Sequence, residues 1–227
     1  MADHTVFTVV CHYDISDEAY KVASRFKTQP TRLLMSTILH GIGTTSLHFT
    51  TSMFDVQTKL KLASLSFKYI LIDKLTRRPK NIPDWFIAKH QHLNPGHKTP
   101  DWIASDIPAD VSRVHRKKYT VRFSDTDANR HLNNNMFIRI CFDAAAEAAS
   151  NHLFINFTNE FFTYRVKAAS CEYRKECRPN EEVEVHVWEE LKDSSIHFFM
   201  VNLTKQVVCF ACRVVFHNPD RVLQNKL

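Results

Sequence analysis

The chain changes character between residues 119 and 149, and this change constrains its fold more than any other feature. The run YTVRF is typical of a strand and leads into ten positions, 125–134, that are rich in polar side chains. This polar cluster consists of Asp125, Asp127, Asn129, His131, Asn133 and Asn134. Apolar residues then recur at helical spacing: Met136, Phe137, Ile140, Ala144, Ala145 and Ala148. The pattern predicts a strand, a polar cluster and a helix that begins beside the cluster.

The start of this helix is suited to stabilise negative charge. Backbone N–H groups of a first helical turn, together with the helix dipole, favour charge developing on a bound carbonyl oxygen. The carboxylates and His131 supply groups for acid and base catalysis. A plainer interpretation is that Asp127 and the asparagines shape a turn and cap the helix, which is the commoner role for each residue alone. The combination with His131 favours a catalytic site.

Two motifs carry a resemblance to a known family. The run DTDANRHLNNNMFIRICFDAA, followed by EYRKEC at residues 172–177, resembles the hot-dog-fold acyl-ACP thioesterases of plants and bacteria. The resemblance implies that Asp127, Asn129 and His131 match three catalytic positions of the family and that Glu176 matches a fourth. A third segment, residues 66–86, looks like the closing strand of the family's first hot-dog repeat. The likeness covers about residues 41–216.

The resemblance implies an α+β fold, a tandem (double) hot-dog whose antiparallel sheets wrap around a long helix in the C-terminal repeat. TSLHF at 45–49 and SSIHF at 194–198 indicate an internal duplication. We expect an N-terminal repeat at 1–90, a linker at 91–114, a C-terminal repeat at 115–218 and a tail at 219–227. The first repeat has only residues 16–26 for a helix, so we expect its central helix to be short or missing.

The chemistry that the resemblance implies is hydrolysis of an acyl thioester. Asn129 and His131 would bind or polarise the reacting groups, Asp127 would orient them and Glu176 would activate water. Asp127 as the base or nucleophile is an alternative. A Cys-His-Asn scheme through Cys177 is another. If residues 171–177 are extended, Glu176 and Cys177 face opposite sides, so only one of them reaches His131.

The charge of the chain bears on its substrate. A net charge of +6 suits an anionic partner, either an acidic acyl carrier protein or coenzyme A, and no nucleic-acid-binding signature accompanies it. Two basic runs are candidate docking sites or ordinary solvated faces: residues 74–80 and 113–122. We expect substrate contacts from Asn133, Asn134, Arg116, Lys117 and Lys118.

Composition and cysteine content indicate the kind of protein and the cell compartment to expect. With 44% hydrophobic and 24% charged residues the chain can bury a sizeable core, and it has no long apolar run for a membrane helix. No secretion signal or transit peptide is evident, so we expect a cytoplasmic protein with six reduced cysteines. Cys209 and Cys212 lie three apart on an expected strand and therefore point to opposite faces. His90, His92 and His97 lie in the linker or directly before it, so we expect neither a metal nor a cofactor.

Three function classes remain open from the sequence. The first, which we favour, is an acyl thioesterase. The second is a non-hydrolytic hot-dog hydratase or dehydratase, and the third is a catalytically silent acyl-thioester-binding protein. The Phe-rich residues 151–164 are expected to line an acyl tunnel, to cover it or to pack between subunits. A homodimer that covers the first repeat is also open.

Overall fold

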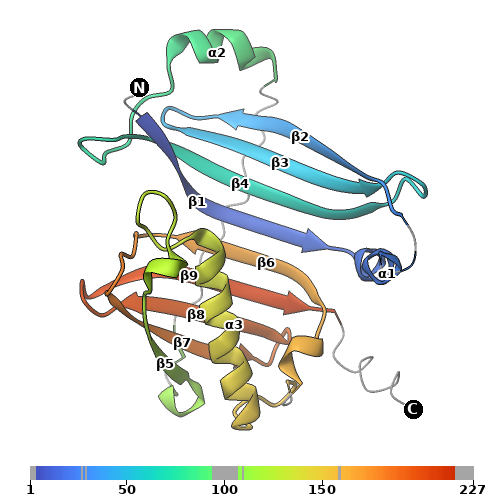
Figure 1. Cartoon of the computed structure of the whole chain (residues 1–227), viewed down its shortest axis with the longest axis vertical. Helices are drawn as coiled ribbons and strands as arrows, with labels where there is room; N and C mark the ends of the chain where they lie inside the picture. Colours follow the sequence, from blue (N-terminus) through green and yellow to red (C-terminus); the bar gives the residue numbers. More distant parts are fainter. Residues whose placement is uncertain are drawn as a thin grey trace. The chain divides into compact units, whose positions relative to one another are not determined.

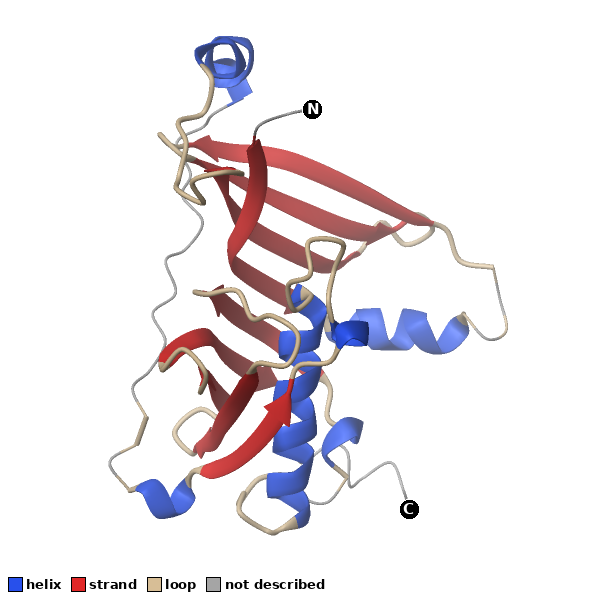
Figure 2. Cartoon of the chain, turned by 60° about the vertical axis from the view of Figure 1, so that its left-hand side comes forward, coloured by secondary structure: helices blue, strands red, loops and turns tan. Residues whose placement is uncertain are grey.

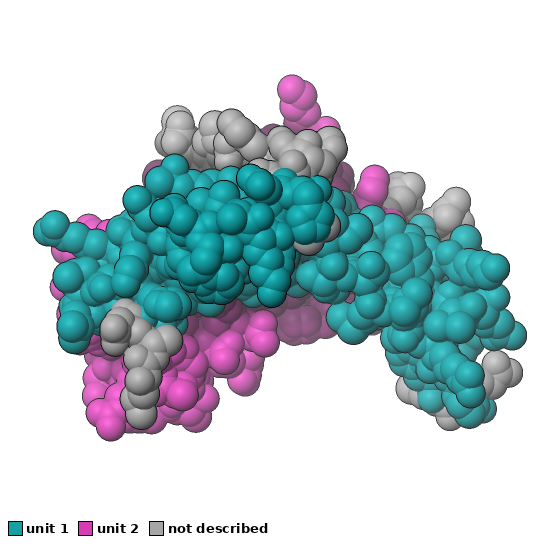
Figure 3. All heavy atoms as spheres, turned by 90° about the horizontal axis from the view of Figure 1, so that it is seen from above, with its two compact units in different colours: residues 1–102 teal, residues 103–227 magenta. Residues whose placement is uncertain are grey.

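The computed structural model describes residues 4–26, 28, 30–93, 107–108, 110–157 and 160–217. The chain divides into two compact units, Met1–Trp102 (unit 1) and Ile103–Leu227 (unit 2), which Figure 3 colours separately. Most of the expected linker, with His97, and the whole expected tail lie outside the described residues. The domain boundaries therefore stay a prediction.

Unit 1 is an antiparallel sheet with short helices (Figure 1). Its strands lie in the order β2-β3-β4-β1, joined by antiparallel ladders. The elements are β1 (His4–Ile15), α1 (Asp17–Arg25), β2 (Leu33–Ile42), β3 (Ser46–Asp55), β4 (Lys61–Asp73), α2 (Asp84–His90) and the 3-10 turn η1 (Gln91–Leu93). Strand β2 exposes apolar side chains, since Leu34, Met35 and Ile38 are each more than half accessible.

Helix α1 occupies the segment in which we expected the helix of unit 1. Ser16 caps it, accepting a hydrogen bond from the N–H of Ala19 at 3.2 Å, and the Ser16 hydroxyl donates to the carbonyl of Leu62 at 2.9 Å. The helix has 9 residues and buries Val22, whereas the helix of unit 2 has 17. Within the described part of unit 1, the helices are thus short, as the sequence indicated.

Unit 2 is a second antiparallel sheet with one long helix (Figures 1 and 2). Its strands lie in the order β6-β9-β8-β7-β5, again joined by antiparallel ladders. The strands and the helix are β5 (His115–Thr120), α3 (Asn134–Ser150), β6 (Val166–Tyr173), β7 (Glu182–Glu190), β8 (Ser195–Asn202) and β9 (Val207–Phe216). Three 3-10 turns accompany them: η2 (Val111–Arg113), η3 (Phe123–Asp125) and η4 (Phe161–Thr163).

Helix α3 forms the core of unit 2 because its apolar side faces the sheet. Figure 2 shows the helix running along one face of the strands. Phe142 stacks on Phe198 of β8 with ring centroids 6.2 Å apart, and Phe137 lies 5.2 Å from Phe210 of β9. The buried helical residues are Phe137, Ile140, Cys141, Ala144, Ala145, Ala148 and Ala149. The small alanines bring the helix close to the strands, and the predicted helix is confirmed.

The Phe-rich segment after α3 packs partly into this core. Phe154, Phe157 and Phe161 are buried, and the ring of Phe157 lies 4.9 Å from that of Phe216 on β9. A buried carboxylate, Glu189 of β7, anchors the segment. It accepts hydrogen bonds from the N–H of Ile155 at 2.6 Å and from the backbone and side-chain nitrogens of Asn156 at 3.0 and 2.7 Å.

The cysteines are buried free thiols. On β9, Cys212 has its sulfur 3.4 Å from that of Cys171, whereas the thiol of Cys209 donates to the carbonyl of Met200 at 3.2 Å. The two cysteines therefore have different neighbours. Among the residues that the structure describes, no group of three side chains is arranged to hold a metal ion. No helix in this described part is long and apolar enough to cross a membrane.

Candidate active site

The polar cluster forms a tight loop between η3 and α3. The N–H of Asp127 donates to the carbonyl of His131 at 2.9 Å, and Thr126 and Leu132 form an antiparallel bridge. Arg130 makes the reversal with a φ of 59°, a left-handed conformation that few residues other than glycine adopt. The loop therefore brings the two ends of residues 126–132 together and presents His131 directly before the helix.

The carboxylate of Asp127 holds this loop from within. Its Oδ1 accepts hydrogen bonds from the N–H of Asn129 at 2.8 Å and of His131 at 3.1 Å, and its Oδ2 lies 3.4 Å from the amide nitrogen of Asn129. Burial raises the pKa of Asp127, but the hydrogen bonds from His131 and Asn129 outweigh it, so the net pKa is lowered. An ionised Asp127 thus orients the main chain at Asn129 and His131.

Asp125 ties the loop to β5. Its buried carboxylate accepts hydrogen bonds from the hydroxyl of Tyr119 and from the N–H of Arg122, both at 2.8 Å, and its carbonyl accepts from the N–H of Asn133 at 2.9 Å. Burial and the Asp125 carboxylate together raise the pKa of Tyr119. We did not single out Tyr119 from the sequence, although the alternation of β5 places it on the side of Lys117, away from Lys118.

Glu176 reaches the loop from the segment between β6 and β7. Its Oε2 lies 3.2 Å from Nε2 of His131, and both side chains are about three-quarters or more buried. Strand β6 ends at Tyr173, so residues 171–177 do not form one extended strand, and Glu176 lies in the irregular segment that follows it. The carbonyl of Cys177 instead accepts a hydrogen bond from the N–H of Leu132 at 2.8 Å, which joins the two segments beside the His131–Glu176 contact.

Arg174 is close to Glu176 in the sequence, but its ion pair is with another carboxylate. The guanidinium of Arg174 pairs with Glu172 at 2.7 Å, on the strand that precedes the segment. The contacts of the Asp127 carboxylate with Asn129 and His131, and of His131 with Glu176, bring these four residues together.

Cys177 faces the core and not the site. It has no exposed surface, and its sulfur accepts a hydrogen bond from the side-chain amide of Asn202 at 3.5 Å. The neighbouring side chain of Cys209 lowers the pKa of Cys177 against the effect of burial, while the same pairing raises the pKa of Cys209. Even so, a thioester carbonyl cannot reach the Cys177 sulfur, because this side chain has no exposed surface.

Asn133 and Asn134 lie at the start of α3. Asn133 is the N-cap, since its side-chain oxygen accepts from the N–H of Asn135 at 3.1 Å. The carbonyl of Asn134 accepts a hydrogen bond from the hydroxyl of Tyr173 at 3.4 Å. The capping role that the sequence left open is therefore confirmed for Asn133. This cap also fixes the first turn of α3 next to His131.

The basic residues of β5 do not share one face. Arg116 and Lys118 are exposed, whereas Lys117 turns toward α3 and forms an ion pair with Glu147 at 2.7 Å. Strand alternation separates them, a signal that the sequence contained. Arg116 and Lys118 therefore share one face of β5, and Lys117 lies on the other.

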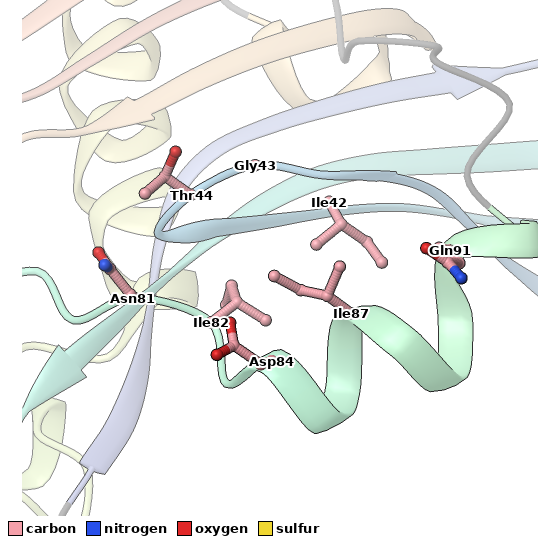
Figure 4. A pocket seen from close by; sticks show the side chains of 8 residues that line it. All are labelled: Ile42, Gly43, Thr44, Asn81, Ile82, Asp84, Ile87 and Gln91. Carbon is pink, nitrogen blue, oxygen red and sulfur yellow. The ribbon is translucent and has the colours of Figure 1, made fainter.

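Unit 1 contains a groove of its own (Figure 4). Its volume is about 350 Å³, and Figure 4 shows Ile42, Ile82 and Ile87 gathered at its centre, between the β2–β3 turn and α2. The polar lining consists of Thr44, Asn81, Asp84 and Gln91. Among the described residues that line this groove there is one carboxylate but no histidine, cysteine or basic side chain, in contrast to the His131–Glu176 pair of unit 2.

The candidate site of unit 2 is thus an imidazole paired with a carboxylate beside a capped helix start. Residues 108–212 match the family model of the acyl-ACP thioesterase C-terminal domain. The matched part of the chain carries all four site residues, Asp127, Asn129, His131 and Glu176.

Solved structures show the fold of nearly the whole chain. The 12:0-ACP thioesterase from Umbellularia californica superposes with a TM-score of 0.70 at 15% identity, covering 95% of this chain and 76% of its own. An oleoyl thioesterase (putative) from Lactobacillus plantarum gives 0.68 at 16%, covering 95% and 77%. An acyl-ACP thioesterase from Bacteroides thetaiotaomicron gives 0.66 at 16%, with the same coverage. The chain thus has the double hot-dog fold that we expected. No curated protein sequence matches it.

Proposed function

We propose that this protein is a thioester hydrolase that releases free fatty acid from fatty acyl thioesters by attack of water on the thioester carbonyl. The observation that carries the proposal is the contact between His131 and Glu176, 3.2 Å apart, within the acyl-ACP thioesterase domain. A partly buried imidazole–carboxylate pair is suited to move a proton between water and a leaving group.

The proposed reaction uses the four residues in different ways. Glu176 accepts a proton from water as the water oxygen bonds to the carbonyl carbon. Asn129, His131 and the start of α3 bind the carbonyl oxygen while it carries negative charge. When the carbon–sulfur bond breaks, the proton passes to the thiolate of the leaving group. The products are a fatty acid and a free thiol.

Asp127 has the orienting role in this proposal. Its carboxylate already accepts the N–H groups of Asn129 and His131, and its lowered pKa makes it a weaker base than an ordinary aspartate. These contacts support Glu176 over Asp127 as the base. The burial of Cys177 likewise supports water over a cysteine nucleophile.

The carrier that we propose is an acidic acyl carrier protein or coenzyme A. Support comes from the net charge of +6 and from the exposed side chains of Arg116 and Lys118 on β5. We also propose a cytoplasmic location, which suits the free thiols. A homodimer is part of the proposal, because β2 exposes Leu34, Met35 and Ile38.

The test is thiol release by purified protein from a panel of acyl-CoA and acyl-carrier-protein substrates of different chain length. Glu176→Gln is expected to lower kcat roughly 10²-fold or more, the scale for losing a positioned acid or base. Substrate binding should persist, because the change keeps the size of the side chain. Wild-type protein that binds acyl thioesters and never releases thiol would contradict the proposal and favour the silent or hydratase class.

A further inference from the structure

The segment that carries Glu176 is irregular, yet it is held at several points. Strand β6 ends at Tyr173 and β7 begins at Glu182, so no sheet ladder fixes the residues between them. The N–H groups of Arg174 and Lys175 both donate to the carbonyl of Cys209, at 2.9 and 3.1 Å. The carbonyl of Cys177 is held by Leu132 from the other side. Glu176 lies between these two attachments.

A third attachment comes from the turn between β8 and β9. The ammonium group of Lys205 donates to the backbone carbonyl of Glu176 at 3.1 Å and forms an ion pair with Glu181, with Nζ 2.8 Å from Oε1 and 3.0 Å from Oε2. The carboxylate of Glu181 also accepts from the side-chain amide of Asn202 at 2.7 Å and from the N–H of Arg178 at 2.9 Å. Lys205 thus bridges the two ends of residues 176–181.

The carboxylate of the Lys205–Glu181 pair is more buried, and accepts more hydrogen bonds, than that of a typical surface ion pair. The Glu181 side chain is only 13% exposed, and the same carboxylate is bound by two further nitrogen donors. Burial raises the pKa of Glu181, but Lys205, Arg178 and Asn202 outweigh it and lower the net pKa, so the Glu181 carboxylate is ionised at neutral pH. A charged network of this kind fixes geometry where an isolated exposed pair contributes little.

We infer that Lys205, held by Glu181, is a positioning residue that fixes the backbone of Glu176 so that its carboxylate stays against His131. The inference rests on the proposed hydrolase function and adds to it a residue outside the motifs that the resemblance supplied. Lys205 acts through Glu176, and its contact is with the Glu176 main chain. Because a displacement of about 1 Å in a catalytic group can cost up to roughly 10²-fold in rate, a loosened segment lowers kcat more than it changes KM.

The experiment compares Lys205→Met in two backgrounds, wild type and Glu176→Gln. In the wild-type background, Lys205→Met is expected to lower kcat roughly 10-fold with little change in KM. In the Glu176→Gln background it is expected to have almost no further effect, because the group that it positions is already disabled. Lys205→Arg, which keeps a charged donor, should restore most of kcat.

The matched control is Arg213→Met. Arg213 pairs with Asp193 at the open end of the same β8–β9 hairpin, away from the turn that carries Lys205. Its loss is expected to leave kcat near the wild-type value once rates are compared at equal folded fraction, which thermal unfolding of each variant provides. Hydrogen exchange of residues 174–181, measured by mass spectrometry, should be faster in Lys205→Met than in the control.

The outcomes separate the inference from the proposed function. An unchanged kcat in Lys205→Met, or an equal loss in both backgrounds, overturns the positioning role while active wild-type protein upholds hydrolysis. If wild-type protein hydrolyses nothing, the proposed function fails. In that case, or if Glu176→Gln has no measurable turnover, hydrogen exchange decides: faster exchange at 174–181 supports the attachment, and exchange equal to the control overturns it.

Discussion

Two residues that are neighbours in sequence, Glu176 and Cys177, have opposite surroundings. Replacing Cys177 by alanine is expected to leave most turnover intact, since the sulfur lies in the core with Asn202 and not beside His131. The change should cost some stability through lost packing. Rates must therefore be compared at equal folded fraction. An acyl adduct on Cys177 that forms and decays at the catalytic rate, seen by mass spectrometry, would overturn water attack.

At Asp127, the lowered pKa gives a pH dependence with a definite sign. The carboxylate stabilises the folded state in its ionised form, so this contribution is fully present above the ordinary pKa of 3.8 and is lost as the pH falls through the lower folded-state value. The Tm of wild type should exceed that of Asp127→Asn at neutral pH, and the difference should shrink as the pH falls below 3.8. A difference that is constant with pH contradicts this account.

At the scale of elements, Glu189 of β7 fixes the Phe-rich segment that follows α3. Glu189→Ala removes a buried carboxylate that accepts three hydrogen bonds and leaves the nitrogen donors of Ile155 and Asn156 without this acceptor. The expected loss in unfolding free energy is about 1.5–3 kcal/mol, the range for hydrogen bonds to charged groups, measured by urea unfolding. Glu189→Gln, which keeps one acceptor oxygen, should lose less. If Glu189→Ala and Glu189→Gln lose the same unfolding free energy, the hydrogen bonds of Glu189 are not the cause of the loss.

Sequence patterns determined some elements well and missed others for physical reasons. The helix at 134–150 was predictable because its apolar side follows one period over four turns, and the segment 16–26 expected to hold a helix contains α1. The end of β6 was not predictable, since it depends on β9: Arg174 and Lys175 both bond to Cys209, and the regular ladder stops there. No local signal connects Lys205 to Glu176.

For the molecule as a whole, the net charge of +6 predicts a salt-dependent KM. Raising the salt from about 0.01 M to about 1 M shortens the Debye length from about 30 Å to about 3 Å and should raise KM for an anionic acyl carrier several-fold, with kcat nearly constant. The double variant Arg116→Glu, Lys118→Glu should raise KM at low salt and reduce this dependence. The control is the double variant Lys59→Glu, Lys61→Glu, which makes the same change of charge at exposed positions in and beside β4. If the two variants change KM equally, the net charge of the protein explains the salt dependence, and β5 is not a docking site.

The short helices of unit 1 also matter during synthesis. A ribosome delivers the first sheet before the second, and at roughly 5–20 residues per second the rest of the chain takes on the order of ten seconds to appear. Throughout that interval β2 presents Leu34, Met35 and Ile38 on a nascent chain without the long helix that packs against the sheet of unit 2. Such a strand is a target for chaperones and for pairing with neighbouring nascent chains. We therefore expect the yield of folded protein in a cell to depend on how fast translation proceeds through residues 103–227.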